Sequence, residues 1–166
     1  MRAYAVMHSV YEDSYDVCLS KFILFKDRRT AEAVLLKDFL SDINRYENAC
    51  EISYSQDEGR YSLCFDEMNY AGGMIREVEV SNIPANNDIV YLLWGYFWEY
   101  NDWDGNLYAA SGIKEDMQKE MKRGYHLNLA REDMDWEQLH CDDDCTYLET
   151  TDNERYVTFV TDVKLV

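Results

Sequence analysis

Two stretches of this chain place an apolar residue at every fourth position. The first contains Ala31, Leu35, Phe39 and Ile43, and the second contains Ile113, Met117, Met121 and Tyr125. This spacing puts the apolar side chains on one face of an α-helix, and it is typical of a surface helix packed on a sheet. The chain is therefore expected to bury two amphipathic helices against β-structure.

Local signals predict where these helices begin and end. Asp27 precedes the first helix as an N-cap, because its carboxylate can accept a backbone hydrogen bond from the first turn. The second helix is expected to begin at Ser111 or Gly112. The sequence Lys122-Arg123-Gly124 predicts its end, since cations favour the last turn and glycine the position after it.

Strand-like runs flank both helices. They span residues 3–10, 17–25, 51–55, 60–65 and 74–80 in the first half, and 90–97, 106–110, 146–150 and 155–166 in the second. Turn-forming sequences separate them, among them Ala71-Gly72-Gly73 and Asp104-Gly105. The pattern predicts an α+β fold with mainly antiparallel sheets, each carrying one packed helix.

The two halves align with each other across a central polar stretch that contains the only proline of the chain. At a constant offset, for example, Tyr4 meets Tyr91. We therefore expect two related ββα(β) halves, residues 1–80 and 89–166, joined by a linker at 81–88 and packed as one unit. Chance similarity between two ordinary ββα units is the alternative. A junction between equivalent halves would be a natural place for a ligand cleft.

The balance of charge narrows the range of partners. The chain has 166 residues and a formal net charge of −17. Such a charge disfavours direct binding to nucleic acid, whose phosphates it would repel, and also binding to anionic membranes. It favours association with a basic protein surface. The alternative is that the acidity serves solubility alone.

The charge is concentrated near the C-terminus. Ten acidic residues and no lysine or arginine occur between residues 132 and 154: Glu132, Asp133, Asp135, Glu137, Asp142, Asp143, Asp144, Glu149, Asp152 and Glu154. Neighbouring carboxylates repel one another unless a cation relieves them, so this segment, with Trp136, predicts a docking surface for a basic partner. A solvated acidic loop is the alternative interpretation.

Aromatic residues make up 14% of the chain and cluster after the linker. Trp98, Tyr100 and Trp103 fall at the end of a predicted strand, where they would serve as interface anchors. The alternative is an ordinary core strand of an aromatic-rich protein. In the docking hypothesis, these rings supply the desolvated centre of an interface whose rim is acidic.

Cysteine usage and the N-terminal sequence bear on compartment and metals. Five cysteines occur without the spacing of a disulfide scaffold, and neither a leader-like apolar segment nor a run long enough to span a bilayer is apparent. A cytoplasmic location with reduced thiols is expected. His140, Cys141 and Cys145 are weak candidates for a metal site, because two thiols and an imidazole can bind zinc. No cofactor is expected.

Motifs for catalysis are missing from the sequence: it contains no nucleophile elbow, no phosphate-binding glycine loop and no H-E-x-x-H. The leading hypothesis is therefore a non-catalytic acidic protein that docks on a basic surface. In its sharpest form it mimics nucleic acid and inhibits a nucleic-acid-binding enzyme. In composition the chain resembles the small acidic inhibitors that phages and other mobile elements use against host defence nucleases. A small-molecule module with a cleft between the halves, or a metal-dependent protein or enzyme, are the alternatives.

Overall fold

The computed structural model describes the chain except for residues 12–17, 66–69, 84–87, 100–101 and 153. The described residues form a mixed α/β structure of ten mostly antiparallel strands and two helices. The chain divides into two compact units. The N-terminal unit comprises Arg2–Glu77 with Leu165–Val166, and the C-terminal unit comprises Val78–Lys164 with Met1. Within the described residues, neither helix combines the length and apolar character needed to cross a membrane.

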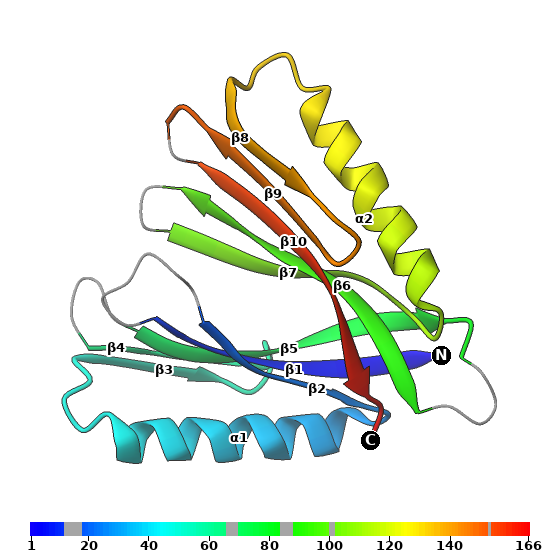
Figure 1. Ribbon diagram of the computed structural model, residues 1–166. Coiled ribbons are helices and arrows are strands. Elements are labelled where there is room, and N and C mark those ends of the chain that lie inside the picture. The colour runs from blue at the N-terminus through cyan, green and yellow to red at the C-terminus, as the bar shows by residue number, and fades with distance from the viewer. Residues whose placement is uncertain (12–17, 66–69, 84–87, 100–101, 153) are drawn as a thin grey trace. The chain divides into compact units, whose positions relative to one another are not determined.

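The N-terminal unit contains six elements (Figure 1). In chain order they are β1 (Arg2–Tyr11), β2 (Cys18–Phe25), α1 (Arg28–Arg45), β3 (Glu51–Ser55), β4 (Arg60–Cys64) and β5 (Tyr70–Ser81), which belongs to this unit as far as Glu77. The strands lie in the order β2-β1-β5-β4-β3. The pairs β1–β2, β3–β4 and β4–β5 are antiparallel.

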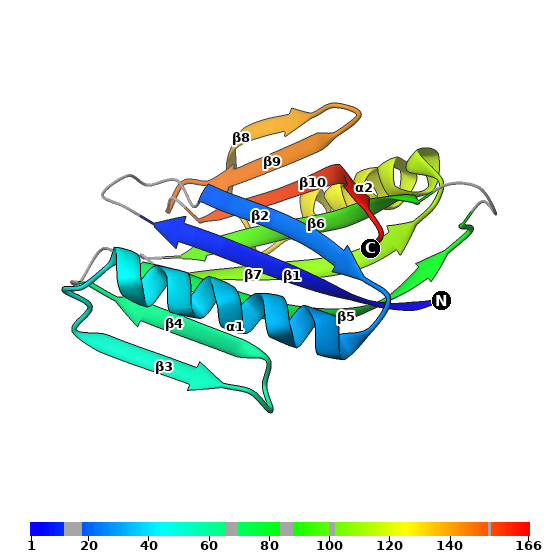
Figure 2. The same ribbon diagram turned by 90° about the horizontal axis from the view of Figure 1, so that it is seen from below.

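Helix α1 runs along one face of these strands (Figure 2). As expected, the Asp27 side chain accepts a hydrogen bond of 2.8 Å from the Thr30 backbone N–H, which satisfies one free donor of the first turn. The predicted stripe points inward. Its members Ala31 and Leu35 are buried in a cluster with Val6, Phe25, Tyr61 and Leu63, and Phe39 and Ile43 pack against that cluster.

The C-terminal unit contains six further elements (Figure 1). They are β6 (Ile89–Glu99), β7 (Asp102–Ser111), α2 (Lys114–Leu129), β8 (Trp136–Cys141), β9 (Cys145–Thr150) and β10 (Arg155–Lys164). Their strands lie in the order β7-β6-β10-β9-β8, and the last residues of β5 pair in parallel with the end of β7. Under α2, Met117 and Met121 pack against Leu93 and Val160.

Both units thus follow the order β-β-α-β-β-β, and their strands pair in the same order. Residues of the two units can be matched by their rank within corresponding elements, and we call residues of equal rank equivalent. For example, Leu35 and Met121 are each the eighth residue of their helix, and Val6 and Leu93 the fifth residue of their strand. The predicted relatedness of the halves, and the linker whose residues 84–87 lie outside the described residues, stay predictions.

Several local predictions are wrong where strand pairing or helix packing overrides the local signal. Helix α2 begins at Lys114 and not at Ser111 or Gly112, because Ser111 is paired in β7. Helix α2 does not end at Gly124 as predicted but continues five residues further, to Leu129. A glycine inside a helix costs only about 1 kcal/mol, which the packing of the helix on the sheet offsets. The predicted turn Ala71-Gly72-Gly73 lies buried inside β5, paired with β4. The predicted Asp104-Gly105 turn lies inside β7, opposite Phe97 and Tyr96.

Strand β8 was not predicted at all. Residues 136–141 have an acidic, exposed sequence that resembles a loop, and five of the six are exposed. They nevertheless pair antiparallel with β9, from Trp136 opposite Thr150 to Cys141 opposite Thr146. The strand occupies the edge of the C-terminal sheet, where only one neighbour is needed and polar side chains face solvent on both sides.

Candidate functional site

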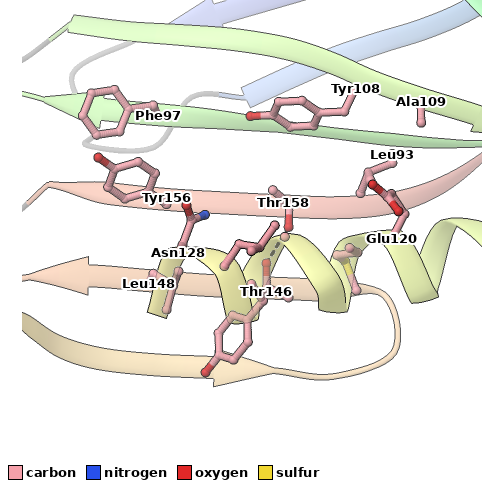
Figure 3. A pocket seen from close by; sticks show the side chains of 14 residues that line it. Leu93, Phe97, Tyr108, Ala109, Glu120, Asn128, Thr146, Leu148, Tyr156 and Thr158 are labelled. Atoms are coloured by element: carbon pink, nitrogen blue, oxygen red, sulfur yellow. Dashed lines mark hydrogen bonds between the residues drawn. The ribbon is translucent and has the colours of Figure 1, made fainter. Parts of the chain in front are cut away.

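A pocket of about 420 Å³ lies between α2 and the sheet of the C-terminal unit (Figure 3). Side chains from α2 and from β6, β7, β9 and β10 line it: Leu93, Phe97, Tyr108, Ala109, Glu120, Met121, Gly124, Tyr125, Leu127, Asn128, Thr146, Leu148, Tyr156 and Thr158. This volume is typical of sites that hold small organic molecules. All lining residues belong to the C-terminal unit, so the pocket differs from the cleft that we predicted at the junction of the halves.

The walls of the pocket are mostly apolar. Leu93 and Leu148 on the sheet and Met121 on α2 are at most 5% exposed and line it. The rings of Phe97 and Tyr156 meet at one end, with centroids 4.4 Å apart. Such a surface binds ligands chiefly by removing apolar area from water.

Seven of the fourteen lining residues carry a polar side-chain group, three of them tyrosine hydroxyls. The hydroxyls of Thr146 and Thr158 are hydrogen-bonded to each other (Figure 3). The Glu120 carboxylate accepts hydrogen bonds from Arg123, and this partner lowers the pKa of Glu120 below its ordinary value. In contrast, the Asn128 side chain makes no hydrogen bond with any described residue, although it lines the pocket. Figure 3 shows Asn128 near Tyr156 at one end and Glu120 at the other.

The equivalent space in the N-terminal unit is filled by Tyr61. Its ring lies where a side chain on Gly73 would be: a Cβ at that position would come 2.6 Å from Tyr61 Cε1. The Tyr61 hydroxyl donates to Asp42 Oδ2 at 2.7 Å, and His8 Nε2 lies 2.8 Å from the same oxygen. Tyr61 and Asp42 are 3% and 5% exposed. One phenol therefore bridges the sheet and the helix.

These hydrogen bonds set the ionisation of the N-terminal network. Burial opposes the charge on Asp42, but the hydrogen bonds from His8 and Tyr61 outweigh it and hold the pKa of the carboxyl below its ordinary value. Burial, reinforced by the hydrogen bond to Asp42, raises the pKa of Tyr61. The phenol is therefore neutral and the carboxylate charged at neutral pH.

None of these four residue types is retained at the equivalent positions of the C-terminal unit. Thr146 stands where Tyr61 does, each the second residue of its strand. By the same ranking, the replacements for Gly73, Asp42 and His8 are Thr158, Asn128 and Gly95. The short threonine cannot cross from sheet to helix, so the space stays open and Asn128 loses both equivalent partners.

The acidic segment is divided between the two ends of β8. The β8–β9 turn carries Asp143 and Asp144, and both are neutralised from α2. Lys122 Nζ lies 2.7 Å from Asp143, and Lys114 Nζ lies 2.8 Å from Asp144. The contact with Lys114 lowers the pKa of Asp144. These two carboxylates therefore stabilise the packing of the turn on the helix and are not available to a partner without competition.

Three further members of the segment are satisfied locally. Asp133 pairs with Arg131 at 2.9 Å, and the nearly buried Glu149 pairs with Arg155 at 2.9 Å. Asp142 accepts hydrogen bonds from two backbone N–H groups of its own turn, which lower its pKa together with a contact from His140. Lysine or arginine thus neutralises four of the ten carboxylates, and hydrogen bonds satisfy a fifth, Asp142.

The other five carboxylates have no ion pair with a described residue, and they gather at the opposite end of β8. This end joins the start of β8 to the β9–β10 turn, where the Thr151 backbone N–H donates to the Asp135 carbonyl at 3.0 Å (Figure 1). The five are Glu132, Asp135, Glu137, Asp152 and Glu154, and we call them the acidic corner.

Two of the predicted aromatic anchors fall at the same end of the sheet. Trp98 on β6 pairs with Arg155 on β10 and with Trp103 on β7. Arg155 directly follows the acidic corner in sequence. Strand register thus brings the backbone of Trp98 and Trp103 close to that corner, whereas Tyr100 lies outside the described residues.

The metal candidates lie together on the β8–β9 hairpin, but their polar atoms bond elsewhere. His140 Nε2 lies 3.1 Å from Asp142, and the thiols of Cys141 and Cys145 are directed at carbonyl oxygens. Burial raises the pKa of Cys145, which disfavours the thiolate that zinc requires. Among the described residues, no group of three or more His, Cys, Asp or Glu side chains is placed to hold a metal ion.

The residues that line the pocket are suited to binding. Glu120 is the one carboxylate among them, it is held by Arg123, and no histidine, cysteine or lysine lines the walls. A general acid–base pair or an activated nucleophile would need such groups within hydrogen-bonding distance of each other.

Comparisons with known proteins provide no further guide. No family model matches the chain, and neither a curated protein nor a solved structure matches it. The pocket was also not predicted from the sequence. One sequence signal for the pocket was present, because Asn128 lies on the same helix face as Met121 and Tyr125. The predicted helix end at Gly124 excluded Asn128 from the helix and so concealed this signal.

Proposed function

We propose that this chain is a non-catalytic binding protein whose principal site is the pocket beneath α2. The observation that carries this proposal is the contrast between equivalent positions. Tyr61 fills the helix–sheet space of the N-terminal unit, whereas Thr146 leaves about 420 Å³ open in the C-terminal unit. An open apolar pocket forfeits the contacts that a packed core provides, and a ligand would restore them.

The test places the residues that fill the N-terminal space at the equivalent positions of the pocket. The variant Thr146→Tyr with Thr158→Gly introduces the phenol and the glycine that accommodates it. The ligand probe is N-phenyl-1-naphthylamine, an uncharged molecule whose fluorescence rises in apolar surroundings. We expect the native protein to bind this probe and the double variant to lose binding while its thermal stability is unchanged or higher.

Gln138→Tyr is the matched control, because it adds a tyrosine on the exposed strand β8, away from the pocket. It should bind the probe as the native protein does. The proposal fails if the native protein does not bind the probe, or if the folded double variant binds it equally well. All four tryptophans lie in the C-terminal unit, so their fluorescence reports whether this unit is folded.

The second candidate function is docking on a basic protein, and the acidic corner favours it. Five carboxylates without an ion pair to a described residue attract cations, and the register places the strand ends of Trp98 and Trp103 beside them. If the basic partner binds nucleic acid, occupation of its basic surface would inhibit it by competition, as a mimic of the phosphate backbone does.

Two variants of equal charge separate a docking site from mere net charge. The first neutralises the acidic corner (E132Q/D135N/E137Q/D152N/E154Q). The second neutralises five exposed carboxylates elsewhere (E47Q/E51Q/D57N/D88N/E115Q). Docking predicts that the first variant loses far more affinity for an oligolysine peptide at low salt. Equal losses would mean that the acidity acts only through the total charge.

A further inference from the structure

The side chain of Asn128 suggests the chemistry of the ligand. It lines the pocket, it is half-buried, and its amide makes no hydrogen bond with a described residue. An amide in such a place offers two donors and an acceptor that water or a ligand must satisfy. This inference rests on the proposed pocket function and specifies what the pocket takes.

The N-terminal unit shows which partner suits this position. Asp42 is the fifteenth residue of α1, as Asn128 is of α2. Asp42 accepts a hydrogen bond from the Tyr61 hydroxyl. The Tyr61 ring passes over Gly73 and packs beside Phe39, with ring centroids 5.3 Å apart. The equivalents of these residues all line the pocket. The empty volume therefore runs along the route that a tyrosine side chain takes in the other unit.

We propose that the pocket binds a small, uncharged aromatic molecule with a hydroxyl group at one end, which takes the place of the Tyr61 side chain. Its ring packs beside Tyr125, which is the twelfth residue of α2 as Phe39 is of α1, and its hydroxyl exchanges a hydrogen bond with Asn128. The Tyr125 ring supplies the contact that aromatic ligands prefer. An anionic ligand is disfavoured by the net charge of −17.

The matched probes are p-cresol and toluene, which differ by the hydroxyl alone. Without a hydrogen bond in the pocket, toluene would bind more tightly, because transfer of the hydroxyl from water costs free energy. With the bond to Asn128, we expect p-cresol to bind about 3- to 10-fold more tightly than toluene. Affinities are measured by NMR chemical-shift titration of the native chain.

Asn128→Leu tests the residue. It keeps a good helix former at the site and removes the amide, so the preference should reverse in favour of toluene. Asn44→Leu is the control: it makes the same change at an exposed position of α1 and should retain the preference for p-cresol. Tryptophan fluorescence verifies that the C-terminal unit of each variant is folded.

The outcomes separate this inference from the function on which it rests. If toluene binds as tightly as p-cresol or more tightly to the native protein, or if Asn128→Leu keeps the preference for p-cresol, the phenol inference is overturned while the pocket stands. If neither probe binds, and N-phenyl-1-naphthylamine also fails, the pocket function itself is refuted.

Discussion

The two units of this protein have the same order of helix and strands, but the space between helix and sheet is filled in one and open in the other. In the N-terminal unit, Tyr61 crosses from β4 to α1, and its hydroxyl meets a buried carboxylate. In the C-terminal unit, Thr146 stops short, and an open pocket remains under α2. The helices present the same stripe and the strands pair in the same order. A few side chains therefore decide whether this space is a packed core or an open pocket, and the shared arrangement of helix and strands does not.

Polar residues at equivalent positions of the two units are therefore expected to have different roles. A polar residue of the N-terminal space is part of a satisfied network, so its loss should be measured as stability. A polar residue of the C-terminal space faces an open pocket, so its loss should be measured mainly as ligand affinity. The following predictions test that division.

The largest effect is expected when the bridging residue is truncated. Tyr61→Ala empties a packed space and removes the hydrogen bond to Asp42, and it should lower the free energy of unfolding by about 3–5 kcal/mol. Thr146→Ala, its counterpart, loses one hydroxyl contact and should cost about 1 kcal/mol or less. Urea unfolding followed by circular dichroism measures both. Similar costs would contradict the division between core and pocket.

The next largest effect concerns charge at the helix positions. Asp42→Asn should cost about 1.5–3 kcal/mol at pH 7, because the buried carboxylate makes two hydrogen bonds. The pKa of Asp42 is lower in the folded protein than its ordinary value of 3.8. Its charge therefore contributes stability that is present above that value and is lost as the pH falls through the folded pKa.

The pH dependence supplies the control for this prediction. Below about pH 4, the native protein should lose stability more steeply than the Asp42→Asn variant, and the two unfolding curves should converge. Asn128→Asp, the reverse exchange in the C-terminal unit, has no tyrosine or histidine at the equivalent positions. It should therefore gain no comparable stability at pH 7.

A third prediction concerns the glycine beneath Tyr61. Gly73→Ala should cost about 1–3 kcal/mol, because the added methyl would lie 2.6 Å from Tyr61 Cε1 and 3.0 Å from Leu35 Cδ1. In a Tyr61→Ala background the same substitution has room and should be nearly neutral or stabilising. A double-mutant cycle measures this coupling. Additive costs would mean that the ring does not occupy the place that the comparison assigns to it.

The smallest effect is expected at the aromatic end of the pocket. Trp136 packs edge-on against Tyr156, and its Nε1 is buried without a hydrogen-bond partner among the described residues. Trp136→Phe removes this donor along with some apolar area, so stability should stay within about 1 kcal/mol of the native protein. Trp94→Phe should cost more, because Trp94 Nε1 donates to Thr161 at 2.9 Å.

The features that the sequence predicted well are those that depend on near neighbours along the chain. The two apolar stripes, the Asp27 cap and most strands were expected, and the structure confirms a mixed α/β fold with mainly antiparallel pairing. Periodicity and capping involve residues within about four positions of each other, so the sequence shows them directly. A claim that the halves are related, and every claim about a partner, stays a prediction.

The features that only the tertiary structure decided involve residues far apart in the chain. Asp143 and Asp144 look unneutralised in sequence, yet lysines of α2 reach both. The pocket exists because Thr146 and Thr158, on two neighbouring strands, are both too short to reach Asn128 on a helix. The order of residue types along the chain determines periodicity, charge and local turns. A cavity, in contrast, depends on the combined size of side chains that only folding brings together. Only the packed structure shows where side chains fail to fill the space between them.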